Sequence, residues 1–351
     1  MKALSLPMFL TIKQDVIEDL TDHLIARIEN VTRMKTIILT SNGITRRFPR
    51  IIDTMKSTFN DLYVFYVEDS TYENALEAAR KISVEDYELV IGIGGGKVLD
   101  TTKYAAYVSK KRYISIPTVL SNDGIASPIA VLKIGGGRVK SFGCKIPDGI
   151  VIDINVIKNA PIDLLKAGIG DVLSNFTALY DWELSFKNGR AKFDDFAYLL
   201  SETALNLILY GREQDIQSDD FIRQLAQALV LSGLAMDISG TSSPCSGSEH
   251  LFNHALDQFY DVHIPHGLKV ALGTLGSCIF QHRDYSVIVD CLKKYHVNVS
   301  PEKIGIDKDT FVGAWMKAKS TRPERFTILD IVDLSISYLE ETYYKISEVL
   351  K

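Results

Sequence analysis

The first half of the chain alternates short apolar runs with longer amphipathic segments, a pattern typical of a parallel α/β sheet. Runs rich in β-branched and aromatic residues predict strands at 35–40, 62–67, 88–93, 113–117 and 149–153. Helices are expected at 71–81 and after the glycines at 94–96. We therefore predict a Rossmann-like, mostly parallel sheet with right-handed crossovers. The runs 129–134 and 138–142, joined by Gly135–Gly137, predict an antiparallel hairpin added to this sheet.

The pattern changes after Asn159-Ala160-Pro161, beyond which strand-like runs nearly vanish. Long helical patterns, such as 171–186 and 195–210, continue to the C-terminus. Proline-marked loops near 240–244 and 264–267 interrupt them. We therefore expect two domains, an α/β domain over 1–158 and an all-helical domain over 159–351.

Composition and charge narrow the class of protein. The chain has 351 residues, of which 46% are hydrophobic and 24% charged, and a formal net charge of -5. A mildly acidic chain without a long Lys/Arg run is not expected to bind nucleic acid. Its apolar runs fall short of the roughly 18 residues that span a bilayer, and its first residues lack a secretory pattern, so no membrane insertion is expected. Four cysteines without CxxC spacing indicate free thiols, and we expect a cytoplasmic protein.

A glycine-rich loop, Gly94-Gly95-Gly96-Lys97-Val98, follows the third predicted strand. Glycines allow the backbone to approach a pyrophosphate closely, and N–H groups at a helix N-terminus favour the anion. The loop is not a Walker A motif, because Ile91 and Val98 replace its first glycine and its Ser/Thr. It is not GxGxxG either, because Lys97 replaces the last glycine. By itself the loop is also compatible with a purely structural connection between strand and helix.

A polar loop at 117–128 directly follows the fourth predicted strand, 113–117. Ligands of α/β sheets bind at such strand ends. It carries the hydroxyls of Thr118, Ser121 and Ser127 and the carboxylate of Asp123. The alternative is a solvated turn, but so many polar groups at this edge of a sheet favour a functional loop.

Four of the seven histidines fall between His250 and His266. His250 and His254 are four residues apart, so on a helix both imidazoles project from one face. His266, in the loop that follows, can close on the same point. Imidazole is a common ligand of transition metals, and a site with open positions indicates catalysis, although two core histidines are the alternative. His263 lies outside this motif and is expected at the surface.

Taken in order along the chain, these motifs resemble the superfamily of iron-containing alcohol dehydrogenases, glycerol dehydrogenases and dehydroquinate synthases. The shared motifs are Gly94–Asp100, the Pro-Thr-x-x-Ser-x-Asp loop at 117–123, Gly170-Asp171, His250 with His254, and His266-Gly267. Within the superfamily, Ser121–Pro128 and Ser246–His250 are most similar to the glycerol-1-phosphate dehydrogenases. The resemblance spans about residues 35–275 and implies a dehydroquinate synthase-like fold, with a nucleotide-binding first domain and a metal- and substrate-binding second domain.

The resemblance implies one divalent metal held by Asp171, His250 and His266. One carboxylate and two imidazoles suit zinc, the favoured metal, and also iron or nickel. Asp171 is expected at the start of a helix, where it would otherwise be a plain N-terminal cap. Asp123 and His254 are implied as catalytic residues that hydrogen-bond the substrate hydroxyls, with His254 relaying a proton.

The resemblance also implies NAD or NADP as the hydride carrier. Gly94–Val98 would cradle the pyrophosphate, and Thr118, Ser121 and Ser127 would reach the nicotinamide half. Ser41 ends the first predicted strand, where an acidic residue would favour NAD by repelling a 2′-phosphate, so NADP should be tolerated.

The implied reaction is reversible hydride transfer between NAD(P)H and the small-molecule substrate dihydroxyacetone phosphate, giving sn-glycerol 1-phosphate. The enzyme is expected to be a homo-oligomer. A glycerol dehydrogenase acting on unphosphorylated glycerol is the first alternative, because no lysine is identified that would bind a phosphate. A dehydroquinate-synthase-like lyase is the second, although the resemblance then implies Glu in place of Asp171. A non-catalytic metal-binding or regulatory protein is the third, although neither the ligands nor the glycine loop are lost.

Overall fold

The computed structural model describes residues 6–135 and 138–350. These residues form two compact units. The first comprises the described residues up to Leu120 together with Gly124–Pro161, and the second comprises Ser121–Asp123 together with the residues from Ile162 onward.

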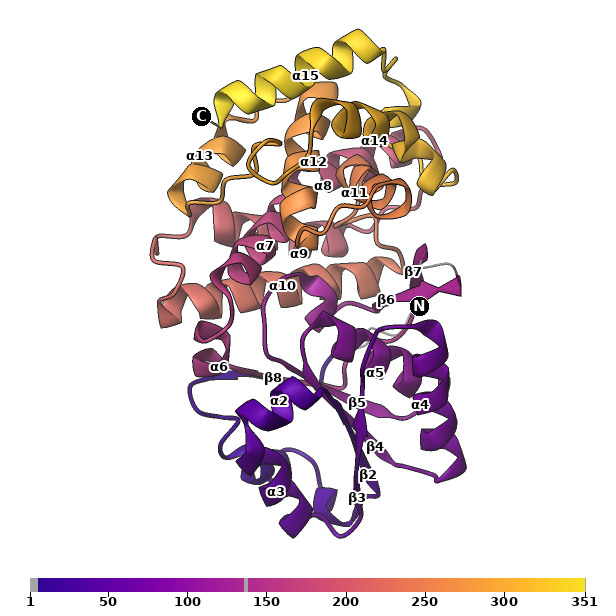
Figure 1. The fold of residues 1–351 in the computed structure, drawn as a ribbon, viewed down its shortest axis with the longest axis vertical. Helices are drawn as coiled ribbons and strands as arrows, with labels where there is room; N and C mark the ends of the chain where they lie inside the picture. The colour runs from indigo at the N-terminus through magenta and orange to yellow at the C-terminus, as the bar shows by residue number, and fades with distance from the viewer. Residues whose placement is uncertain (1–5, 136–137, 351) are drawn as a thin grey trace. The chain divides into compact units, whose positions relative to one another are not determined.

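The first unit is built on a six-stranded sheet in which every pairing is parallel (Figure 1). Its strand order is β1 (Phe9–Lys13), β8 (Gly149–Asp153), β5 (Arg112–Pro117), β4 (Leu89–Gly94), β2 (Thr36–Thr40) and β3 (Leu62–Tyr66). The parallel sheet predicted from the sequence is therefore confirmed. The edge strand β1 was not predicted, because it is short and only Phe9 among its five residues is buried, so it lacks a buried-strand pattern.

Helices cover both faces of this sheet (Figure 1). On one face, α1 (Leu20–Ile25) and α3 (Pro49–Thr58) share a core with strand residues such as Ile38. On the other, α4 (Tyr72–Val84) and α5 (Gly96–Val108) share a core with Ile37. Neighbouring strand residues point to opposite faces, so a strand that is buried along its whole length, such as β2, contributes to both cores. The unit also contains η1 (Val31–Arg33), α2 (Asn42–Arg47), α6 (Ile154–Lys158) and, reaching its boundary, η2 (Asp123–Ile125).

The predicted hairpin forms, but it does not join the main sheet as expected. β6 (Ile129–Ile134) and β7 (Arg138–Gly143) make a separate two-stranded antiparallel sheet. It packs on α4 and α5 through aromatic side chains: Phe142 stacks on Tyr72 at 5.2 Å between ring centroids and meets Tyr104 edge-on. This aromatic contact is a tertiary interaction that strand patterning does not encode. Part of the predicted glycine turn, at 136–137, lies outside the described residues.

The second unit contains helices and no strand among its described residues, as predicted. Its helices are α7 (Ile162–Leu173), α8 (Asn175–Lys187), α9 (Asp195–Tyr210), α10 (Asp219–Ser239), α11 (Ser248–Phe259), α12 (His266–Phe280), α13 (Ser286–Lys294), α14 (Lys308–Thr321) and α15 (Ile336–Val349), with the 3₁₀ turn η4 (Ile328–Asp330). Side-chain caps start several of them, among them Asp194 on α9 and Ser218 on α10, each accepting from an N–H of the first turn.

In the part of the chain that the structure describes, α10 is the one helix long and apolar enough to cross a membrane by those criteria. However, 67% of its most apolar window is buried inside the fold, where it packs against α9 and α7. Burial within a helical core accounts for its composition.

Candidate active site

Asp171, His250 and His266 converge in the second unit. Each offers one ligand atom, and the three atoms lie within 4.8 Å of one another. Nε2 of His266 is 3.3 Å from Oδ1 of Asp171, and the rings of His250 and His266 are 5.2 Å apart. One carboxylate and two imidazoles at this spacing can contact a single divalent cation and leave further positions open.

A close crossing of α7 and α12 positions two of these residues. A Cβ on Gly170 would lie 2.3 Å from the carbonyl oxygen of Gly267, and one on Gly267 would lie 1.8 Å from the carbonyl oxygen of Ala167. Glycine is therefore required on both helices for their backbones to approach this closely. Because Asp171 follows Gly170 and His266 precedes Gly267, the crossing places Asp171 beside His266.

This crossing corrects two predictions about local structure. Asp171 does not start a helix over 171–186; it lies in the last turn of α7, and α8 begins separately at Asn175. Asp171 is therefore not an N-terminal cap. The glycines before it pack helices together rather than separate them. His266 is likewise the first residue of α12 rather than part of a loop.

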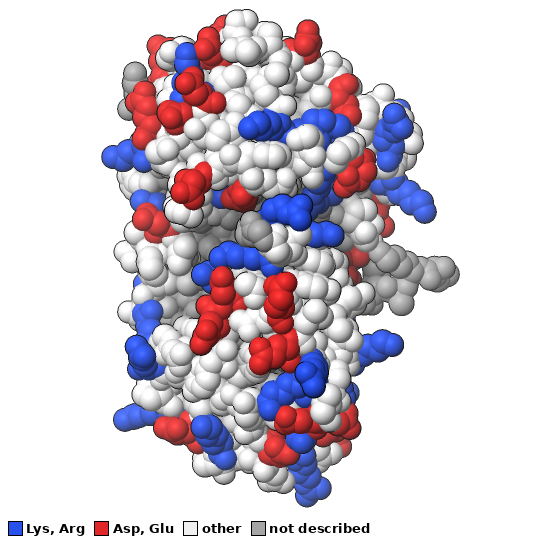
Figure 2. Space-filling view, turned by 45° about the vertical axis from the view of Figure 1, so that its right-hand side comes forward, with Lys and Arg blue, Asp and Glu red and all other residues white. Residues whose placement is uncertain are grey.

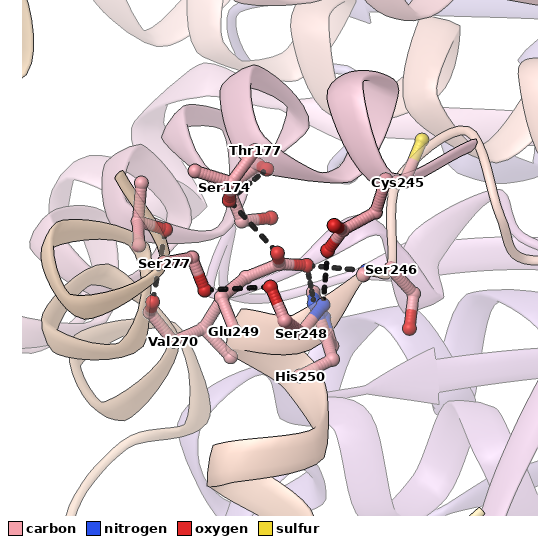
Figure 3. Close-up of polar contacts among 12 residues, drawn as sticks. Ser174, Thr177, Cys245, Ser246, Ser248, Glu249, His250, Val270 and Ser277 are labelled. Atoms are coloured by element: carbon pink, nitrogen blue, oxygen red, sulfur yellow. Dashed lines mark hydrogen bonds and ion pairs between the residues drawn. The ribbon is translucent and has the colours of Figure 1, made fainter. Parts of the chain in front are cut away.

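A buried carboxylate that the sequence interpretation missed orients His250 (Figure 3). Oε1 of Glu249 is 2.9 Å from Nδ1 of His250, and Oε2 of Glu249 accepts a hydrogen bond from Oγ1 of Thr177 at 2.8 Å. When Glu249 is ionised it only accepts, so Nδ1 then carries the proton and Nε2 is left free to contact a metal. The signal available in the sequence was a Glu directly before a His, which is too common to single out.

A second buried carboxylate, Asp181, fixes the start of α11. Its two oxygens accept the N–H groups of Ser248 and Ile328 at 2.7 and 2.8 Å. A Cβ on Gly247 would lie 2.6 Å from Oδ2 of Asp181 and 2.9 Å from Oε2 of Glu249, so glycine lets both carboxylates approach. Burial raises the pKa of each carboxyl to about 7.

Both helix α11 histidines are held in the neutral form. Burial, and next the charge of His266, lower the pKa of His250 to about 3, while burial and then Arg322 lower the pKa of His254 well below its usual value. A neutral imidazole is the form that binds a metal. His254 lies outside the triad, with its ring 6.5 Å from that of His250.

The structure places the residues of the polar loop in different units. Asp123 belongs to the second unit, and its backbone N–H donates to Oδ2 of Asp171 at 2.9 Å. Ser121 belongs to the same unit, whereas Thr118 and Ser127 are buried in the first. The contact with Asp171 ties Asp123 through its backbone to the group of Asp171, His250 and His266, which could hold a metal ion.

The glycine-rich loop joins β4 to α5 in the first unit. Gly94 packs on Val98, where a Cβ would lie 2.7 Å away, so glycine is needed there to close the turn. Gly95 is the N-cap of α5, in extended backbone and with no side-chain cap. A Cβ on Gly95 would meet only Val119, at 3.5 Å, and one on Gly96 would meet nothing within 4 Å. The helix N-terminus thus presents uncapped N–H groups beside open space that an anion can fill.

The structure also places other residues named in the sequence analysis. The side chain of Lys97 is 67% exposed and lies 3.6 Å from Asp69. Ser41 is the N-cap of α2 in extended backbone, directly after β2. His263 is at the surface, as predicted, with 89% of its side chain exposed, and all four cysteines are free thiols, also as predicted. Acidic and basic side chains both occur across the face drawn in Figure 2.

Comparisons with known proteins agree with this architecture. Residues 11–161 match the family described as iron-containing alcohol dehydrogenase. The chain is 35% identical over 336 residues to a glycerol-1-phosphate dehydrogenase (NAD(P)+) of Methanoculleus marisnigri, covering 94% of this chain and 91% of that one. It is 36% identical over 271 residues to the protein of the same name from Pyrococcus horikoshii, covering 77% and 78%.

Solved structures share the fold at lower identity. The glycerol dehydrogenase of Schizosaccharomyces pombe superposes with a TM-score of 0.80 at 18% identity, over 99% of this chain and 91% of that one. A probable glycerol dehydrogenase from Sinorhizobium meliloti gives 0.78 at 18% identity, over 99% and 98%. The predicted fold class, an α/β domain followed by a helical one as in these dehydrogenases, is confirmed.

Proposed function

We propose, from the premise that this chain belongs to the glycerol-1-phosphate dehydrogenase family within the iron-containing alcohol dehydrogenases, that it is a metal-dependent oxidoreductase. It transfers a hydride reversibly between NAD(P)H and dihydroxyacetone phosphate, giving sn-glycerol 1-phosphate. The observation that carries this proposal is the convergence of Asp171, His250 and His266 within 4.8 Å. A chain with these relatives and this donor set has the groups that such a reaction needs.

The donor set fits a divalent cation. Asp171, His250 and His266 would hold it, and zinc is the favoured ion, with iron and nickel as alternatives. When bound, the cation supplies a Lewis acid toward the oxygen on the reacting carbon. Glu249 keeps Nε2 of His250 available by accepting a hydrogen bond from Nδ1–H, and Asp123 orients Asp171 through its backbone N–H.

The loop Gly94–Val98 fits the pyrophosphate of NAD or NADP, because the space beside Gly95 and Gly96 is open and the N-terminus of α5 lacks a side-chain cap. When bound, the nicotinamide ring carries the hydride. Thr118, Ser121 and Ser127 are assigned to the nicotinamide half of the cofactor. Ser41 carries no charge that would repel a 2′-phosphate, so both cofactors are accommodated.

His254 and Asp123 act on the substrate. His254 is neutral and one helical turn from His250, so it can donate one N–H to a substrate oxygen and accept a proton at its other nitrogen. It therefore relays the proton that the reduced carbonyl gains. The carboxylate of Asp123 accepts a hydrogen bond from a substrate hydroxyl.

The domain roles follow from these assignments: residues 1–158 bind the nucleotide, and residues 159–351 bind the metal and substrate. A cytoplasmic location and a homo-oligomeric assembly stay predictions from the sequence. Asp171, where the lyase alternative implies Glu, counts against a dehydroquinate-synthase-like activity.

The proposal is tested by mixing the purified protein with NADH or NADPH and dihydroxyacetone phosphate, and following the loss of reduced-nicotinamide absorbance. The product is then identified with stereospecific enzymes that distinguish the two enantiomers of glycerol phosphate. We expect sn-glycerol 1-phosphate. Absence of turnover in metal-loaded protein, or formation of the other enantiomer, would overturn the proposal.

A further inference from the structure

A lysine with a fully buried side chain holds the polar loop that carries Asp123. Lys103 lies in the middle of α5, and its side chain is 0% exposed. Its Nζ donates to the carbonyl oxygen of Gly124 at 2.7 Å and to that of Ile129 at 2.6 Å. It also lies 3.5 Å from Oδ1 of Asp100. The three donors of the ammonium group thus face three oxygens, two of which are backbone carbonyls of one segment.

The burial of this ammonium group indicates what its position requires. An ammonium group is strongly hydrated, and removing it from water is unfavourable unless other oxygens replace the water. An apolar side chain of similar length would fill the same space without that penalty. Lys103 therefore serves this position through its hydrogen bonds to the two carbonyl groups rather than through packing alone.

The two carbonyl groups flank a buried segment that directly follows Asp123. Residues 125–127 lie between them and are buried. The backbone N–H of Asp123 donates to Oδ2 of Asp171 at 2.9 Å. The chain passes from the second unit back to the first between Asp123 and Gly124. Lys103 thus fixes the backbone at the first residue after this passage.

We propose that Lys103 is a positioning residue: by holding the two carbonyl groups, it keeps the N–H of Asp123 on the carboxylate of Asp171. Asp171 would hold the divalent cation, so the hydrogen bond that it accepts orients a metal ligand. The same anchor fixes the side chain of Asp123, which we assign to a substrate hydroxyl. The expected effect on metal and turnover rests on the proposed function, whereas the effect on the loop does not.

The test compares Lys103→Met and Lys103→Gln with two control variants. Methionine fills a similar space without a donor, whereas glutamine keeps two N–H donors on a shorter, uncharged chain. Lys111→Met removes another lysine of the first unit, which is paired with the exposed Asp86. Ile82→Ala opens a cavity in the core beside α4 and should lower the temperature of unfolding without altering the loop.

Hydrogen–deuterium exchange of the metal-free protein tests the anchor without any reaction. In Lys103→Met, the amides within 123–129 should exchange at least about tenfold faster than in wild type, as for the loss of hydrogen bonds to a charged group. Lys103→Gln should show a smaller increase. In both controls, the exchange rate of this segment relative to that of the neighbouring strand β5 should stay unchanged.

Metal affinity and turnover test what the anchor does for the site. Metal affinity is measured by competition with a chelator, and turnover as kcat/KM for dihydroxyacetone phosphate. In Lys103→Met, both should fall by about 10–100-fold, the loss typical of a group that orients a metal ligand. Both controls should stay near wild type, including Ile82→Ala despite its lowered stability.

Each result decides one claim. Unchanged exchange in Lys103→Met, faster exchange with unchanged metal affinity, or an equal loss of metal affinity in Ile82→Ala would overturn the positioning role and leave the proposed function standing. If Lys103→Met does not fold, Lys103→Gln carries the comparison, with the same direction expected. A metal-loaded wild-type protein without turnover would overturn the proposed function itself, and the exchange experiment would still decide whether Lys103 holds the loop.

Discussion

Oε1 of Glu249 lies 2.9 Å from Nδ1 of His250, so a buried carboxylate sets the orientation of an imidazole that we assign to the metal. Glu249→Ala removes this acceptor and should weaken metal affinity by about 10–100-fold. Glu249→Gln keeps an acceptor oxygen of the same shape and should lose much less. Competition with a chromogenic chelator measures both, and unchanged affinity in Glu249→Ala would contradict the positioning role.

The ligand assignment predicts different outcomes for two histidines on the same face of α11. His250→Ala should lose most of its metal and nearly all activity, because two remaining ligands hold a cation weakly. His254→Ala, the matched control, should keep its metal while losing turnover. Metal analysis of the dialysed proteins tests this, and a His250→Ala variant that retains both metal and activity would show that the ligands are assigned wrongly.

The glycine loop predicts a defect confined to the cofactor. A Cβ on Gly95 meets only Val119, at 3.5 Å, so Gly95→Val should fold, but its branched side chain would project toward the space assigned to the pyrophosphate. We expect the dissociation constant of NADH or NADPH to rise by about tenfold or more, on the order of 1.4 kcal/mol, with metal content unchanged. Gly143→Val, at a β7 position with nothing within 4 Å of a Cβ, is the control. A fluorescence titration showing equal affinities would place the nucleotide elsewhere.

The buried carboxyl pair predicts a pH dependence of stability. Burial raises the pKa of Asp181 and of Glu249 to about 7 from ordinary values of 3.8 and 4.5. The folded state therefore holds protons that the unfolded state has released, and this stabilisation is lost as the pH rises through about 7. The histidines, whose pKa values are lowered, cost stability only as the pH falls below their ordinary value of 6.5.

Chemical denaturation of metal-depleted protein measures this effect. Between about pH 6.5 and about pH 8, the free energy of unfolding should fall by on the order of 1 kcal/mol per carboxyl. Asp181→Asn removes one titrating group and should give a shallower decline. A free energy that does not fall over this interval would mean that both carboxylates are already ionised in the folded protein.

The main sheet could be predicted from the sequence because its central strands are buried on both faces and contain short apolar runs, such as Ile37–Leu39 within Thr36–Thr40. The helix Asp195–Tyr210 was predicted with its observed bounds, since Asp194 caps it and its apolar periodicity is uninterrupted. β1 was not predicted, and the predicted hairpin was wrongly expected to join the main sheet, because edge pairing and the contact of Phe142 with Tyr72 depend on tertiary structure.

The candidate site, like the fold, could be predicted from the sequence only in part. His250 and His254 are four residues apart, so their shared face is a local property of a helix that sequence spacing reveals. Asp171 was proposed as a ligand but placed at the wrong end of its helix, because Gly168 and Gly170 look like a helix break when the packing partner is unknown. Glu249 was missed, since its importance lies in contacts that only the folded chain makes.

The central claim is most directly tested by the ratio of kcat/KM for dihydroxyacetone phosphate to that for dihydroxyacetone, measured with NADH and with NADPH on metal-loaded wild-type protein. A phosphate gripped by charge-assisted hydrogen bonds should favour the phosphorylated substrate by roughly 10²-fold or more, for about 3 kcal/mol of transition-state stabilisation. Equal or better activity on free dihydroxyacetone or glycerol would contradict the claim and assign the chain a glycerol dehydrogenase activity.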